Sequence, residues 1–173
     1  MKNYLKGKTV YLAGSIHHND EDSGVGWRES ITPKLEKYGL NVIDPCKQTM
    51  NGVGEIGQDK ELLKQLIKEK NFKKVKEIFF PILKKDLRCV DVSHFIIVNY
   101  RPVIRHIGTI HELVLANIEK KPVLLYYPPE EISDFNPWIA CLIKERHIFD
   151  NWDIMLEYIS EVDKGNFDTS LWY

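Results

Sequence analysis

Glu112 is the residue whose position most clearly suggests chemistry. It follows Gly108 and Thr109 and precedes an apolar run over residues 113–118, a pattern that predicts a carboxylate in the first turn of a helix. The strand predicted at residues 94–98 would end shortly before this helix. In an open α/β sheet, the carboxyl ends of the strands and the following helix N-termini form the crevice where ligands bind. A carboxylate at this place can act as a nucleophile or as a base.

The same residues also fit a structural role. Thr-x-x-Glu is the pattern of a capping box, in which the Glu112 side chain would reach back to the backbone N–H of Thr109. The two roles are not exclusive, and this segment by itself leaves both open.

The elements that must position Glu112 follow from the apolar patterns. Strands are predicted at residues 9–13, 40–43, 94–98 and 123–126. Besides the Glu112 helix, helices are predicted at residues 27–38, at 59–80 with a division at Asn71, at 81–92 and at 152–162, whereas residues 132–148 are irregular or weakly helical. Strands that alternate with helices predict an α/β fold: a single doubly wound, flavodoxin- or Rossmann-like domain over residues 1–173. This three-layer sandwich would contain a mostly parallel sheet of four to five strands.

The composition is that of a soluble globular protein. Hydrophobic residues make up 43% and charged residues 28% of the 173 residues, and no apolar run approaches the length of a membrane span. A formal net charge of -1 gives no electrostatic argument for nucleic acid or a membrane as a partner. Cys46, Cys89 and Cys141 are widely spaced and residues 1–8 are unlike a signal peptide, so we expect a cytoplasmic protein with reduced thiols.

A lysine-rich stretch lies within residues 59–80. Glutamates lie among these lysines, and no aromatic residues alternate with them as base stacking would require. A solvated amphipathic helix is therefore the preferred interpretation, and a surface that docks an acidic partner protein is the alternative.

Several segments together resemble the nucleoside 2-deoxyribosyltransferase-like family, which includes nucleoside and nucleotide N-glycosidases. The resemblance lies in residues 10–15, 27–28, 42–45, 86–91, 108–113 and 121–123, which occur in order across roughly residues 9–126. It implies that Glu112 is the nucleophile that attacks the anomeric carbon of a (deoxy)ribosyl group, as in retaining glycosidases. Tyr11 would bind this carboxylate or pack on the sugar. The helix dipole is expected to keep Glu112 ionised.

The resemblance also assigns residues to substrate binding. Gly14 and Ser15 would form a turn whose hydroxyl holds a sugar hydroxyl or a phosphate, and Arg28 would bind a phosphate through two hydrogen bonds. The alternative for Arg28 is a surface ion pair with Glu29 or Asp44. Together, Ser15 and Arg28 favour a nucleoside monophosphate as the substrate.

Four further residues are assigned to the binding site by the same resemblance. Asp44 would lie near the nucleobase, although an Asp before Pro45 is also a common turn residue. Asp86 would shape the floor of the site within a charge network with Arg88 and Asp91. Gly108 and Thr109 belong to the segment in which the resemblance is densest.

Two positions depart from the family pattern. Transferases of this family carry aspartates around the positions of His94 and His106, where they bind or protonate the base. A histidine can supply a proton to a leaving base, because its pKa lies near neutrality. The replacements are equally compatible with altered specificity or with a site that binds without turnover.

His17 and His18, with acidic residues at 20–22, lack the spacing of a structural zinc site, so neither a metal nor an organic cofactor is expected. The predicted function is cleavage or transfer of the N-glycosidic bond of a nucleoside or nucleoside 5′-monophosphate. The alternative is a non-catalytic nucleotide-binding module. The resemblance further implies a homodimer or larger homo-oligomer, and the terminal Trp172 and Tyr173 are expected to dock on the chain itself or on a neighbour.

Overall fold

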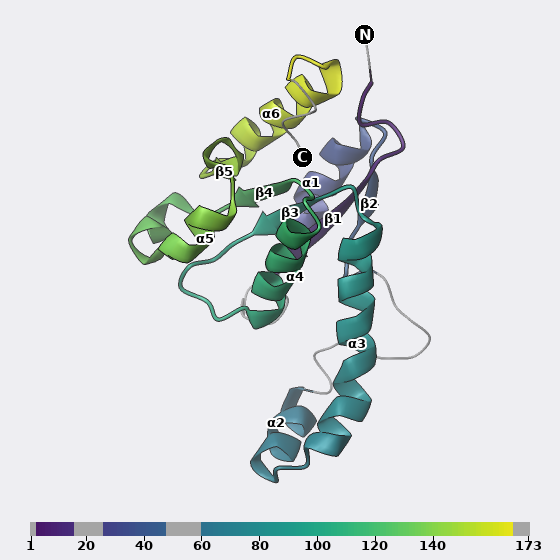
Figure 1. Cartoon of the computed structure of the whole chain (residues 1–173), viewed down its shortest axis with the longest axis vertical. Helices are drawn as coiled ribbons and strands as arrows, with labels where there is room; N and C mark the ends of the chain where they lie inside the picture. Colours follow the sequence, from purple (N-terminus) through teal and green to yellow (C-terminus); the bar gives the residue numbers. More distant parts are fainter. Residues whose placement is uncertain (1–2, 16–25, 48–59, 168–173) are drawn as a thin grey trace.

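The fold is organised around a five-stranded sheet in which every strand pair is parallel (Figure 1). It was examined in a computed structural model that describes residues 3–15, 26–47 and 60–167. The strands are β1 (Thr9–Gly14), β2 (Asn41–Ile43), β3 (Phe95–Asn99), β4 (Val123–Tyr126) and β5 (Ile148–Phe149), in the order β2-β1-β3-β4-β5. This is the flavodoxin-like order of doubly wound sheets. The predicted fold class is therefore confirmed.

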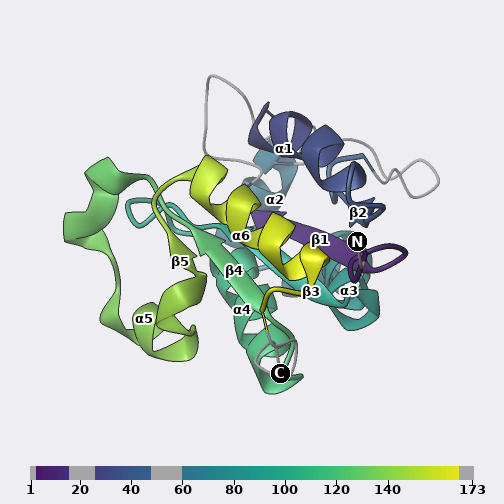
Figure 2. The ribbon, with the colours of Figure 1, turned by 90° about the horizontal axis from the view of Figure 1, so that it is seen from above.

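Helices cover both faces of the sheet, as Figure 2 shows from above. The helices α1 (Gly26–Glu36) and α6 (Trp152–Lys164) pack on one face, against buried side chains such as Leu12 and Leu124. The helices α3 (Phe72–Val92), α4 (Ile107–Ile118) and α5 (Pro137–Leu142) pack on the other face, against Ile96 and Leu125. Successive strand residues point to opposite faces, which is why the buried central strand β3 is apolar on both sides.

The structure differs from the prediction at two elements, α3 and β5. The helix α3 runs without a break through Pro81, where the sequence predicted a boundary. Its second half packs against α4 and β1, and this tertiary packing outweighs the hydrogen bond that a proline removes. The strand β5 was not predicted, because a two-residue strand is too short to show a periodic pattern. The division at Asn71 is confirmed: its side chain caps α3 by accepting a hydrogen bond from the Lys74 N–H at 3.2 Å.

A helical hairpin extends away from the sheet (Figure 1). It consists of α2 (Lys60–Lys68) and the first part of α3, and we call residues 60–80 the arm. Several large apolar side chains on the arm are 40–57% exposed: Leu62, Ile67, Phe72, Phe79 and Phe80. Within the described ranges, no helix combines the length and the apolar character needed to span a membrane.

Candidate active site

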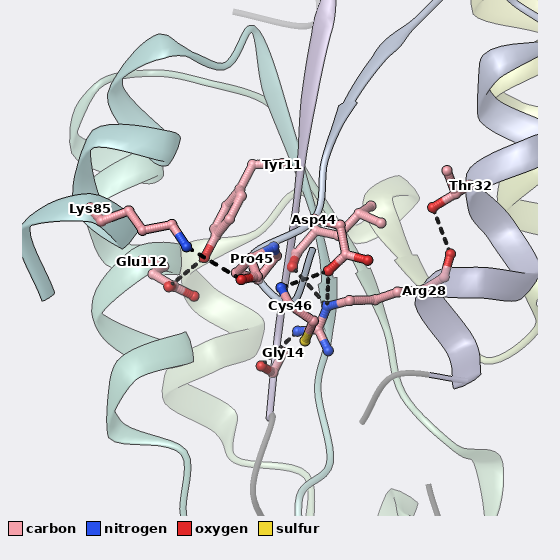
Figure 3. Close-up of polar contacts among 10 residues, drawn as sticks. Tyr11, Gly14, Arg28, Thr32, Asp44, Pro45, Cys46, Lys85 and Glu112 are labelled. Atoms are coloured by element: carbon pink, nitrogen blue, oxygen red, sulfur yellow. Dashed lines mark hydrogen bonds and ion pairs between the residues drawn. The ribbon is translucent and has the colours of Figure 1, made fainter. Parts of the chain in front are cut away.

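Tyr11 and Glu112 form a buried pair between β1 and α4. The Tyr11 hydroxyl donates a hydrogen bond of 2.8 Å to Glu112 Oε1 (Figure 3). The two residues are only 1% and 7% exposed, respectively. Tyr11 points to the sheet face covered by α3 and α4, and there its ring packs within the apolar core. The structure thus joins the two residues assigned to catalysis, although they lie 101 positions apart in the chain.

The helix that carries Glu112 begins earlier than the sequence predicted. Its first residue is Ile107 and its N-cap is His106, so Thr109 is the third helical residue and Glu112 lies in the second turn. The Glu112 carboxylate is held by Tyr11 instead of by the backbone N–H of Thr109. The capping-box interpretation is therefore wrong.

Burial controls the ionisation of Glu112. Removal of the carboxylate from water raises its pKa to about 7, and the nearby Asp86 carboxylate adds to this increase. The Tyr11 hydrogen bond and the charge of Arg28 act in the opposite direction but do not outweigh burial. The expectation that the helix dipole keeps Glu112 fully ionised is wrong, because the dipole effect is confined to the first turn. The structure instead predicts a mixture of protonated and ionised Glu112 at neutral pH.

Asp86 faces this pair from α3. Burial raises the pKa of Asp86, and its charge in turn raises the pKa of both Tyr11 and Glu112. The predicted network with Arg88 and Asp91 is split: these two residues pair with each other on the exposed side of α3. Asp86, which is partly buried, therefore belongs to the cluster with Tyr11 and Glu112 rather than to a surface network.

Arg28 lies on the other side of β1 and is fully buried. Its Nη2 donates to the Gly14 carbonyl at 2.8 Å and its Nε to the Leu12 carbonyl at 3.3 Å, while Asp44 Oδ1 lies 3.7 Å from Nε. The guanidinium also stacks on the ring of Trp27, with 4.5 Å between its Cζ and the ring centroid. The predicted pairing with Asp44 exists, but in the interior instead of on the surface. Arg28 holds the last residues of β1 in place through these hydrogen bonds. A phosphate could contact the buried guanidinium only if these residues moved away from it.

Gly14 and Asn99 lie side by side where β1 and β3 end. A Cβ atom at Gly14 would lie 3.0 Å from the Trp27 ring and 3.3 Å from the Asn99 Cβ, so a larger residue does not fit there without displacing them. The Asn99 Oδ1 atom is buried and has no hydrogen-bond partner among the described residues, and the same holds for Asp44 Oδ2. Buried polar atoms are normally paired, so these two oxygens are candidates for contact with a ligand. Sequence reasoning missed Asn99, although a polar residue that ends an apolar strand was a usable signal.

The two groups of residues flank the switch point of the sheet. In the observed order β2 lies on one side of β1 and β3 on the other, so the strand order reverses between β1 and β3, and ligands of such folds bind at the carboxyl ends of these strands. Figure 3 shows Tyr11 and Glu112 on one side of β1, and Arg28 and Asp44 on the other. Asp44 Oδ1 also accepts the Cys46 N–H at 2.9 Å, as expected for a turn residue. Ser15 follows β1 at this edge and is half-buried.

The two histidines lie at opposite edges of the sheet. His94 directly precedes β3, and its Nδ1 accepts a hydrogen bond of 2.9 Å from the Thr9 N–H at the start of β1. It therefore lies at the amino edge, and the prediction that it lines the crevice is wrong. His106 is buried at the start of α4, on the carboxyl edge, with 5.3 Å between the centroids of its ring and the Tyr100 ring.

Gly108 and Thr109 follow His106 in the first turn of α4, Gly108 exposed and Thr109 buried. His17, His18, Trp172 and Tyr173 lie outside the described residues. Among the residues that are described, no group of three or more His, Cys, Asp or Glu side chains is arranged to hold a metal ion.

Solved structures with this architecture provide the comparison. The chain superimposes on a 2-deoxyribosyltransferase from Bacillus psychrosaccharolyticus with a TM-score of 0.57 and 20% identity, covering 94% of each chain. It superimposes on the CMP N-glycosidase BcmB from Clostridium botulinum with a TM-score of 0.51 and 15% identity, covering 90% of this chain and 99% of that chain. The chain has the fold of these two enzymes. No family model and no curated protein matches the sequence.

The buried carboxylate predicts an unusual dependence of stability on pH. Because the pKa of Glu112 rises from 4.5 to about 7 on folding, the folded state binds the proton more tightly, and stability falls as pH rises through this window. Replacement by Gln removes the charge, so Glu112→Gln should raise the free energy of unfolding at pH 8 by up to roughly 3 kcal/mol. Most of this gain should vanish at pH 5.

Urea denaturation of both proteins at the two pH values measures the effect. Glu119→Gln, which changes a carboxylate just beyond the end of the same helix, is the control and should show no such gain. A Glu112→Gln protein that is less stable than the wild type at pH 8 would contradict the argument.

Proposed function

We propose that this protein cleaves or transfers the N-glycosidic bond of a nucleoside or nucleoside 5′-monophosphate, with Glu112 as the nucleophile and Tyr11 as its hydrogen-bond donor. The observation that carries the proposal is the buried Tyr11–Glu112 pair beside the switch point of the sheet. The shared fold with a deoxyribosyltransferase and a CMP N-glycosidase supports the same reaction class. No metal or organic cofactor is required for this chemistry.

The reaction would proceed in two steps. In the first, ionised Glu112 bonds to the anomeric carbon as the bond to the base nitrogen breaks, and the base leaves with the electron pair and takes up a proton. Asp86 acts on the same pair through its charge, and burial raises its pKa, so we assign the role of proton donor to it. In the second step, water or another base attacks the anomeric carbon, gives up a proton to the Asp86 carboxylate and releases Glu112. Water gives hydrolysis and a second base gives transfer.

A non-catalytic nucleotide-binding module remains the second candidate. Two buried oxygens, Asn99 Oδ1 and Asp44 Oδ2, favour a ligand that donates hydrogen bonds at this edge, whether or not turnover follows. The burial of Arg28 weakens the sequence-based argument for a monophosphate, so nucleosides and 5′-monophosphates must both be tested.

The first test is base release. Incubation with a panel of nucleosides and 5′-monophosphates, followed by chromatography of the free bases, should show release by the wild-type protein. Glu112→Gln should lower the rate at least about 100-fold, because an amide neither attacks nor neutralises the developing positive charge. Substrate binding by calorimetry should be largely retained. Glu119→Gln is the matched control. If every substrate binds without base release, the binding-module alternative holds.

The second test is the pH profile. Glu112 must be ionised to attack, so base release should increase as pH rises through about 7. Tyr11→Phe removes the hydrogen bond that lowers the pKa of Glu112. The increase in the rate of base release should therefore occur at higher pH in this variant. A pH profile that is identical in the two proteins would show that Tyr11 does not tune the carboxylate.

We further infer that the chain forms a homo-oligomer in which the arm docks on a second copy. The arm has seven lysines and three glutamates, a net charge of +4, besides its exposed apolar side chains. Residues 129–163 have nine acidic and two basic residues, a net charge of -7, and include the exposed Trp138 and Ile154. In Figure 1 the arm and the α5–α6 region lie at opposite ends of the molecule. Because the positively charged arm and the negatively charged α5–α6 region lie far apart in one copy, their opposite charges favour contact between two copies.

Light scattering at micromolar concentration tests the assembly. The wild type should be larger than a monomer at low salt, and high salt should weaken the assembly by screening the charges. The double variant Lys73→Glu/Lys76→Glu should dissociate it, whereas Lys37→Glu, outside the arm, should not. A monomeric wild type would reject the assembly.

A further inference from the structure

Glu131 is a buried carboxylate for which the proposed reaction has no role. It lies in the short helix η1 (Pro129–Asp134), which follows β4, and is 6% exposed. Among the described residues, the other buried carboxylates are Asp44 and Glu112, and both belong to the candidate site. A buried charge is strongly unfavourable unless it is paired, so the partners of Glu131 indicate its role.

All the polar partners that we find for Glu131 lie in one loop. Its Oε1 accepts a hydrogen bond of 2.6 Å from Arg101 Nε and is also paired with Arg101 Nη2. Its Oε2 accepts a longer contact of 3.5 Å from the Val103 N–H. This hydrogen bonding raises the pKa of Arg101 above its usual value. Through these contacts Glu131 holds the loop between β3 and α4 in place.

Aromatic contacts join the segment after β4 to the first residue of this loop, and that residue to the last one. The Phe135 ring, just after η1, packs edge-on against Tyr100, with 5.3 Å between the centroids, and against Tyr127, with 5.0 Å. Tyr100 in turn contacts the ring of His106. His106 is the N-cap of α4, and its carbonyl accepts the Ile110 N–H at 3.0 Å. The segment after β4 thus contacts the loop at Tyr100, Arg101 and Val103, and Tyr100 passes the contact on to His106 at the start of the helix.

We propose that Glu131 is a positioning residue: it fixes the start of α4 and thereby keeps the Glu112 carboxylate opposite the Tyr11 hydroxyl. Glu112 lies six positions after the N-cap His106, or roughly 9 Å along a stiff helix. A shift at the helix start is transmitted to the carboxylate. A displacement of about 1 Å is enough to impair a catalytic group strongly.

The test compares Glu131→Gln with Glu130→Gln, which alters the exposed neighbour on the same short helix. The first readout is the titration of the Glu112 side-chain carboxyl carbon by NMR, which needs no turnover. The groups that act on the titration of Glu112 are Tyr11, Asp86 and Arg28, and the Cys89 thiol of α3 also faces it. If the Tyr11 hydrogen bond loosens in Glu131→Gln, the titration of Glu112 moves to higher pH, as in Tyr11→Phe. The two substitutions act through one bond, so their effects should not add in the double variant.

The second readout is base release, and here the inference rests on the proposed function. Glu131→Gln should lower kcat on the order of 10-fold with little change in KM, whereas Glu130→Gln should change neither. If the wild type releases no base, the proposed function fails while the NMR titration still decides the role of Glu131.

A purely structural role predicts a different result. Glu131→Gln would then lower the melting temperature but leave the titration of Glu112 and kcat per folded molecule unchanged, and this outcome would overturn the proposal. Should Glu131→Gln not fold, Arg101→Lys takes its place, because it keeps the charge and loses the two-pronged contact. The same shift of the Glu112 titration is expected there.

Discussion

The hydrogen bond between Tyr11 and Glu112 is the contact on which the candidate site depends, because it joins two elements that share no local sequence. It requires β1 to present Tyr11 to the face covered by α4, and it requires α4 to bring its second turn over that strand. The parallel pairing of β1 with β3 supplies the first condition, and the loop between β3 and α4 supplies the second. Burial then gives the bond its strength, because a hydrogen bond to a charged group gains in a low-dielectric interior. The same burial makes the ionised carboxylate unfavourable.

The two sides of β1 make different contributions to this arrangement. On the α1 side, Arg28 binds the carbonyls of Leu12 and Gly14 and holds the last residues of the strand in place. On the α3 and α4 side, Tyr11, Asp86 and Glu112 form a cluster with two carboxyl groups, and the charge of Lys85 acts on Asp86. Arg28 lowers the pKa of Glu112 from across the strand. A residue assigned to phosphate binding therefore acts on the carboxylate through its charge and on β1 through its hydrogen bonds.

The sequence was most informative where local pattern and tertiary structure agree. Four strands were predicted from apolar runs, because buried parallel strands have few polar residues. The junction at Asn71 was found because an N-cap has a local chemical signature. Pro81 misled the prediction, since its effect on α3 depends on packing that a local pattern does not contain.

The residues of the candidate site were likewise predictable only where a local pattern contains the information. Glu112 was identified by its place before an apolar helix, but its partner could only be assigned by resemblance, because 101 residues separate it from Tyr11. His94 was misplaced for a physical reason that the sequence already contained: a residue that precedes a parallel strand lies at the amino edge, away from the ligand crevice. The burial of Arg28 depends on α1 packing beside the ends of β1 and β2, and such long-range contacts leave no mark in spacing or composition.

A carboxylate with a pKa near 7 is a poor structural element but suits a reaction that develops positive charge. In the resting protein the ionised Glu112 has lost water and gained one hydrogen bond from Tyr11, which offsets only part of that loss. An oxocarbenium-like transition state would place a positive centre beside it, and the attraction would be stronger here than in water because the surroundings are apolar. In the proposed reaction the anion would thus be stabilised less in the ground state than in the transition state, which is the condition for catalysis by binding. The cluster around Tyr11 sets the balance: each further donor would lower the pKa of Glu112 but would also weaken it as a nucleophile. Tyr11, the hydrogen-bond donor to Glu112 within the described residues, would thus leave the carboxylate ionisable near neutral pH and still reactive.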